Sequence, residues 1–172
     1  MIPPVIADTG GLLRALARTP EGKATFPDYR EILISASAVI VPGLVLAEVD
    51  YFLRADRRVM RKLIAEIFDP ATRYEYELPL PSDIARALEL DARFAELDLG
   101  LVDGTVAAIA ERRRVYRVLT TDRRDFSAIR VGPRLPCRKI GASTANSSSP
   151  GQPRTSARYS FAIRPRSINM QN

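Results

Sequence analysis

The chain has 172 residues, of which 46% are hydrophobic and 27% charged, a balance typical of one globular domain. It contains no histidine and a single cysteine, which excludes a Ser/His/Asp triad, a histidine-based ribonuclease mechanism, a histidine-ligated zinc site and a disulfide framework. The net charge of +6 is uneven, because residues 1–125 hold 18 basic and 20 acidic side chains, whereas residues 126–172 hold 8 basic side chains and no acid.

Short apolar runs alternate with helical patterns along residues 1–140. Strands separated by helices of this length are typical of parallel pairing, so we predict a layered α/β fold. In chain order we expect a strand at 4–8, helices at 12–19 and 27–34, a strand at 37–42, helices at 43–54 and 57–68, a strand at 74–78, helices at 81–97 (capped by Ser82) and 100–114, a strand at 115–122 and a last strand at 134–140.

The composition changes after Ile140. Residues 141–172 are rich in Ser, Pro, Gly, Arg and Asn and have no sustained periodicity, so we predict a disordered basic tail behind a folded domain at 1–140. The tail either has no role or adheres to RNA or a partner through its arginines.

Neither a secretory signal nor a membrane segment is expected. The N-terminal stretch MIPPVIADTGG has no basic leader and no small-residue cleavage pattern, which predicts a cytoplasmic protein. The longest uncharged run, residues 32–47, is shorter than the about 20 residues of a membrane helix and is interrupted by Pro42 and Gly43. We therefore assign this run to the core.

Four carboxylates fall in apolar surroundings near the ends of predicted elements. Asp8 ends the first strand and Asp122 ends the strand at 115–122, so both face one crevice if these strands are neighbours. Asp103 lies in the first turn of an apolar helix. Glu48 lies one turn into the helix at 43–54, inside the apolar run VLAEVDYFL.

Each of these acids also has an ordinary structural explanation. Asp8 and Asp122 are suited to capping a helix or turn, Asp103 is favoured by a helix dipole, and Glu48 can pair with one arginine. Together, however, buried carboxylates repel one another, and a shared Mg²⁺ or Mn²⁺ ion would remove that repulsion. Hydrolysis of a phosphodiester is the reaction that such a site supports best.

The motifs VIADTGGLL, VLAEVDYFL and LGLVDGTVAAIAERRRVYRVLTTDRRDF, in this order, resemble those of the PIN-domain ribonucleases, and within them the VapC-type toxins of bacterial toxin–antitoxin pairs. The resemblance covers residues 1–140 and implies a three-layer α/β/α domain around a central parallel sheet. It also implies that Asp8, Glu48, Asp103 and Asp122 bind Mg²⁺ or Mn²⁺ and activate the attacking water, supported by the hydroxyls of Thr9 and Thr120.

The same resemblance implies a toxin that cleaves RNA, tRNA or rRNA in particular. It further implies a homodimer, a cognate VapB-like antitoxin that blocks the acidic crevice, and contact with operon DNA only through that antitoxin. Two features depart from the family: Gly10 stands where relatives often carry Ser or Asn, and residues 141–172 have no expected counterpart. The alternatives are a non-catalytic RNA-binding module and a different metal-dependent phosphohydrolase, such as a DNA flap nuclease.

Overall fold

The computed structural model describes residues 1–122, 130–131, 135–136 and 138–139 of the chain. The predicted tail, residues 141–172, lies outside the described residues, and so do residues 134, 137 and 140 of the predicted last strand at 134–140. The division into a domain and a tail therefore stays a prediction.

Strands and helices alternate in the described chain. The strands are β1 (Val5–Ala7), β2 (Val39–Pro42), β3 (Tyr74–Glu77), β4 (Arg117–Leu119), β5 (Arg130–Val131), β6 (Leu135–Pro136) and β7 (Arg138–Lys139). The α-helices are α1 (Thr9–Leu16), α2 (Pro27–Ser35), α3 (Gly43–Phe52), α4 (Arg57–Ile67), α5 (Pro81–Arg93) and α6 (Leu101–Arg113), and short 3₁₀ turns lie at Leu53–Ala55 and Ala95–Leu97.

Five of these strands form one parallel sheet in the order β3-β2-β1-β4-β7. Ile6 of β1 is in register with Ile40 of β2 on one side and with Val118 of β4 on the other. The N-terminal strand therefore occupies the centre of the sheet, and its carboxyl end lies beside the carboxyl end of β4. The predicted α/β fold with a parallel sheet is confirmed.

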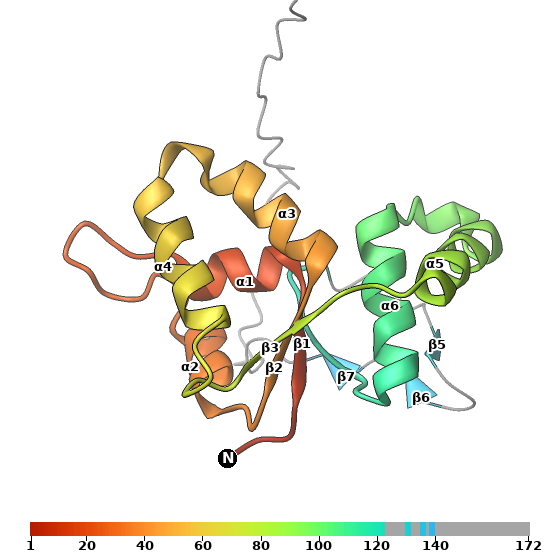
Figure 1. Ribbon diagram of the computed structural model, residues 1–172, viewed down its shortest axis with the longest axis horizontal. Coiled ribbons are helices and arrows are strands. Elements are labelled where there is room, and N and C mark those ends of the chain that lie inside the picture. The colour runs from red at the N-terminus through yellow and green to blue at the C-terminus, as the bar shows by residue number, and fades with distance from the viewer. Residues whose placement is uncertain (123–129, 132–134, 137, 140–172) are drawn as a thin grey trace, which may run out of the picture.

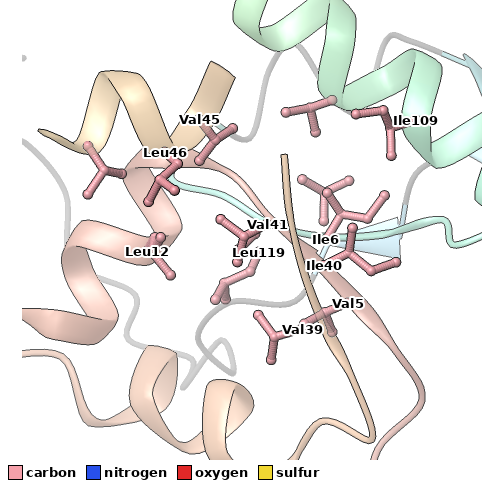
Figure 2. Close-up of a cluster of buried hydrophobic side chains, with 14 of the residues drawn as sticks. Val5, Ile6, Leu12, Val39, Ile40, Val41, Val45, Leu46, Ile109 and Leu119 are labelled. Atoms are coloured by element: carbon pink, nitrogen blue, oxygen red, sulfur yellow. The ribbon is translucent and has the colours of Figure 1, made fainter. Parts of the chain in front are cut away.

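Helices cover both faces of the sheet, which makes a three-layer arrangement (Figure 1). Helices α1 to α4 lie on one side of the strands and α5 and α6 on the other. Ile6 and Ile40 extend toward Ile109 of α6, whereas Val41 and Leu119 extend toward α1 (Figure 2). Because both faces are covered, every residue of β1 and β2 is buried, and the sequence of these strands is continuously apolar.

A network of ion pairs joins the last turn of α6 to the edge strand β3. Arg112 pairs with Asp83 at 3.0 Å and with Glu77 at 2.8 Å, and Arg113 pairs with Glu75 and with Glu77. The glutamates alternate with tyrosines along β3, so the exposed edge of the sheet carries charge, which disfavours pairing with another strand.

Some local expectations are wrong. Ser82 does not cap α5, because the N-cap is Leu80, whose N–H donates to Asp83 Oδ2 at 2.8 Å. Pro81 takes the first helical position, which suits its fixed φ angle. The strand expected at 115–122 is limited to Arg117–Leu119, which leaves Thr120 in the loop that follows the carboxyl end of β4.

No helix of the described chain is long and apolar enough to cross a membrane.

Candidate active site

Asp8 lies at the carboxyl end of the central strand and is 6% exposed. It is also the N-cap of α1, with its Oδ1 accepting the Thr9 N–H at 2.6 Å. Its own N–H donates to the Leu119 carbonyl at 3.0 Å, which ties the end of β1 to the end of β4. Asp8 thus has the capping role that the sequence allowed, while its second carboxylate oxygen points to other partners.

Thr120 holds that second oxygen. Its hydroxyl donates to Asp8 Oδ2 at 2.7 Å, and both side chains are buried. The same hydroxyl accepts the backbone N–H of Asp122 at 3.0 Å, so one threonine connects the first strand to the loop that follows β4.

Glu48 approaches the same place from α3. The hydroxyl of Thr9 donates to Glu48 Oε2 at 2.6 Å, and the Glu48 side chain is half-buried. Because Thr9 is the neighbour of Asp8, this bond places two carboxylates on either side of one threonine. The apolar residues around Glu48 in the sequence anchor its helix in the core, among them Val45 and Val49.

The pKa of Asp8 is raised above its usual value. Burial is the main cause, and the negative charge of Glu48 adds to it, while hydrogen bonds from Thr120, Thr9 and Gly10 act in the opposite direction. The main causes include no lysine or arginine. Within the described chain the carboxylate is held by neutral donors, an environment that suits a divalent ion with oxygen ligands.

The other two predicted acids are more exposed than Asp8. Asp103 lies half-buried in the first turn of α6, directly before a run of fully buried residues, and Asp122 is exposed. Among the residues that the structure describes, no three acidic side chains lie close enough to hold one metal ion together. The structure thus links Asp8 and Glu48, with Thr9 and Thr120, through hydrogen bonds, and the metal-binding roles of all four acids stay predictions.

Two glycines after Thr9 allow the close packing around Asp8. A Cβ on Gly11 would overlap the backbone carbonyl of Leu119, so this position lets α1 lie directly against β4. A Cβ on Gly10 would overlap the hydroxyl of Thr121 and lie 3.1 Å from its Cβ. The side chain of Thr121 therefore occupies the space next to Gly10, where relatives often carry a polar side chain.

Tyr29 is a further contact that the sequence did not reveal. This buried side chain of α2 donates its hydroxyl to the Thr120 carbonyl at 3.3 Å, and Arg14 Nη1 donates to the Tyr29 oxygen at 3.4 Å. The guanidinium of Arg14 also lies over the Tyr29 ring, 5.3 Å from its centroid. The only sequence signal for this role is an aromatic residue with a polar tip on an otherwise amphipathic helix.

A groove of about 560 Å³ lies on a different face of α3. Leu46, Ala47 and Asp50 line it from α3, and Arg57, Met60 and other residues line it from α4. Glu48 is not among its lining residues, so the groove is separate from the carboxylates.

Comparisons with known proteins agree with this architecture. Residues 5–132 match the model of the PIN domain family. The ribonuclease VapC26 of Mycobacterium tuberculosis is 30% identical over 136 residues, which span 73% of this chain and 92% of that protein. The crystal structure of VapC20 from the same organism, a sarcin–ricin loop cleaving toxin, superposes with a TM-score of 0.59 at 19% identity over 70% of this chain and 92% of that one, which supports the fold.

Proposed function

The chain belongs to the PIN domain family as a VapC-type member, and from this premise we propose that it is a toxin that hydrolyses phosphodiester bonds in RNA with Mg²⁺ or Mn²⁺. The observation that carries the proposal is that two carboxylates, Asp8 at the carboxyl end of β1 and Glu48 of α3, each accept a hydrogen bond from a threonine hydroxyl at the same place. The similarity to VapC26, a ribonuclease, supports the same reaction.

The donor set fits a hard divalent cation. The groups around Asp8 include carboxylate and hydroxyl oxygens, and burial, with the negative charge of Glu48 beside it, raises the pKa of this carboxyl. Asp8, Glu48, Asp103 and Asp122 would hold the ion. When bound, it supplies positive charge that polarises the phosphodiester and makes water more acidic.

The residues of the chain orient the reacting groups. Thr9 and Thr120 each donate one hydrogen bond to a carboxylate, which fixes the direction of the oxygens of Glu48 and Asp8. Both hydroxyls are buried or nearly so, and bonds of this kind to a charged acceptor are strong and directional. The site is thereby preorganised before RNA arrives.

The substrate class and the partners follow from the family. We propose a structured RNA, tRNA or rRNA, that presents a single-stranded loop to the carboxylates, since unpaired loops expose their backbone. The activity would then reside in the cytoplasm. A cognate VapB-like antitoxin would block the site, with an arginine against the carboxylates, and would connect the toxin to operon DNA; the toxin itself would be a homodimer.

Cleavage of total cellular RNA by the purified full-length protein tests the proposal. We expect discrete fragments with Mg²⁺ or Mn²⁺, none with EDTA, and none from Asp8→Asn or Asp103→Asn. The matched control is Asp50→Asn, which changes an acid of α3 that faces the groove and pairs with Arg57 at 2.5 Å. This variant should cleave as well as the parent.

Matched RNA and DNA oligonucleotides separate the alternatives. Equal or faster cutting of DNA would favour a flap nuclease or another phosphohydrolase. Absence of metal-dependent cutting in a folded, antitoxin-free sample, with RNA still bound, would favour a non-catalytic RNA-binding module.

A further inference from the structure

The face of α3 that carries Glu48 ends in two exposed aromatic side chains. Tyr51 and Phe52 follow Glu48 by three and four residues, a spacing that places side chains on one helical face. They are 47% and 50% exposed, and their rings meet edge to face with centroids 5.7 Å apart. One helical turn, about 5 Å along the axis, separates them from the carboxylate.

Basic residues surround these aromatics. Five of the nine residues from Arg54 to Lys62 are basic, and all five are exposed. The guanidinium of Arg54 stacks over the Tyr51 ring, 4.3 Å from its centroid. The single acid of this segment, Asp56, is the N-cap of α4.

Three of these cations have no acidic partner in the described part of the chain. Arg57 pairs with Asp50, and Lys62 lies 3.8 Å from Glu66, whereas Arg54, Arg58 and Arg61 belong to no ion pair there. Exposed cations without acidic partners attract phosphates, and exposed aromatic rings offer surfaces on which bases stack.

We propose that this α3–α4 tip, defined by Tyr51, Phe52, Arg54, Arg58 and Arg61, binds the single-stranded nucleotides that flank the scissile bond. The inference rests on the proposed nuclease function and names the surface that would deliver its substrate. The aromatic rings stack on bases next to the bond held at Glu48, and the arginines neutralise the adjoining phosphates. Positive charge at this position also offsets the repulsion between the carboxylates and a polyanion.

A single-stranded RNA is favoured over a protein partner by two observations together. The tip is continuous with the helical face of Glu48, and its excess charge is positive. The groove on the adjoining face of α3 shares Arg61 with the tip, and charged side chains line it beside apolar ones, among them Asp50 and Arg57.

Binding of a fluorescein-labelled 12-nucleotide RNA of mixed sequence to the full-length Asp8→Asn protein tests the inference without cleavage. We expect Tyr51→Ala and Phe52→Ala each to weaken binding at least about 5-fold, since stacking on one ring contributes that much or more. Tyr51→Phe keeps the ring and should bind like the parent. Arg58→Gln with Arg61→Gln should reduce the slope of log Kd against log salt by about 1.4, at about 0.7 per phosphate.

Matched controls lie away from the tip. Phe68→Ala removes an aromatic ring of similar exposure beyond the end of α4, and Arg93→Gln removes an exposed cation of α5, so neither should change RNA affinity. RNA containing 4-thiouridine should crosslink to peptides that include residues 51 and 52.

Affinities of the Tyr51 and Phe52 variants within 2-fold of the parent would overturn the inference, as would crosslinks confined to peptides beyond Ile140. Loss of self-association with unchanged RNA affinity would identify the tip as an interface between copies of the chain and would equally overturn it. Failure of the proposed function is distinguishable, because it appears as absent metal-dependent cleavage by the parent protein.

Discussion

Tyr29 and Thr120 are 91 residues apart in the sequence and are joined by a hydrogen bond of 3.3 Å from the Tyr29 hydroxyl to the Thr120 carbonyl. Thr120 in turn donates its hydroxyl to Asp8. A helix on one face of the sheet therefore fixes the loop that orients the most buried carboxylate of the candidate site.

Tyr29→Phe removes only the hydroxyl and leaves the packing of the ring intact. We expect kcat to fall about 3- to 10-fold with KM unchanged, because one hydrogen bond of about 1 kcal/mol no longer holds the loop. A double-mutant cycle with Thr120→Val should be non-additive, since both changes act on the orientation of Asp8. Fully additive effects would show that Tyr29 acts elsewhere.

Asp8→Asn should abolish cleavage and yet raise thermal stability at pH 7 when divalent metal is absent. The folded-state pKa of Asp8 is raised, so the ionised form is disfavoured in the folded protein, and stability is lost as the pH rises from 3.8 through that raised pKa. The asparagine variant has no carboxyl to ionise at position 8, so its stability does not fall in this pH range for that reason. The difference in Tm, measured by differential scanning fluorimetry, should shrink as the pH falls below 3.8.

Adding divalent metal gives a second comparison between the parent protein and Asp8→Asn. Mg²⁺ or Mn²⁺ should raise the Tm of the parent protein and not that of Asp8→Asn, because binding to the folded state alone stabilises it. An equal increase in both proteins would argue against Asp8 as a ligand.

Gly10→Ala should impair folding and cleavage, because its Cβ would overlap the hydroxyl of Thr121. Combining it with Thr121→Ala removes the overlapping atom and should restore much of the stability. The control is Gly11→Ala, which would collide with the Leu119 backbone and should not be rescued by the change at position 121. Chemical denaturation of the three single variants and of the two double variants, each with Thr121→Ala, measures this directly.

Arg112→Gln should lower the free energy of unfolding by about 3 kcal/mol, because it leaves Asp83 buried without its cation. The side chain of Asp83 is 4% exposed, whereas both partners of the Arg57 and Asp50 pair are nearly half exposed. Arg57→Gln is therefore the matched control and should cost less than about 1 kcal/mol. Similar losses in urea unfolding would contradict the distinction between the two pairs.

The parallel sheet and the position of Asp8 were predictable because they depend on patterns that are local in the sequence. Continuous apolar runs between helices indicated strands covered on both faces, and an acid that directly follows such a run lies at the carboxyl edge of the sheet. The pairing of β1 with β4 meets the condition under which Asp8 and Asp122 were expected to face one crevice, but β4 ends at Leu119 and not at Asp122, so that shared crevice stays a prediction.

The contacts of Tyr29 and Thr121 were not predictable, because they depend on where loops and helices meet in space. An amphipathic pattern indicates that Tyr29 faces inward, but it does not indicate which carbonyl accepts the hydrogen bond of its hydroxyl. The capping of α5 was wrong for a related reason: Asp83 reaches back to the N–H of Leu80 and makes Ser82 unnecessary as a cap.

The central place of the first strand has a consequence for how the protein is made. Asp8 leaves the ribosome early, but its partner Thr120 follows 112 residues later, at about 5 to 20 residues per second. Until that segment emerges, β1 has no β4 beside it and the carboxylate has no fixed orientation. The carboxylate can therefore reach the orientation of the proposed site only after residue 120 has been translated, so the proposed activity would arise late in synthesis.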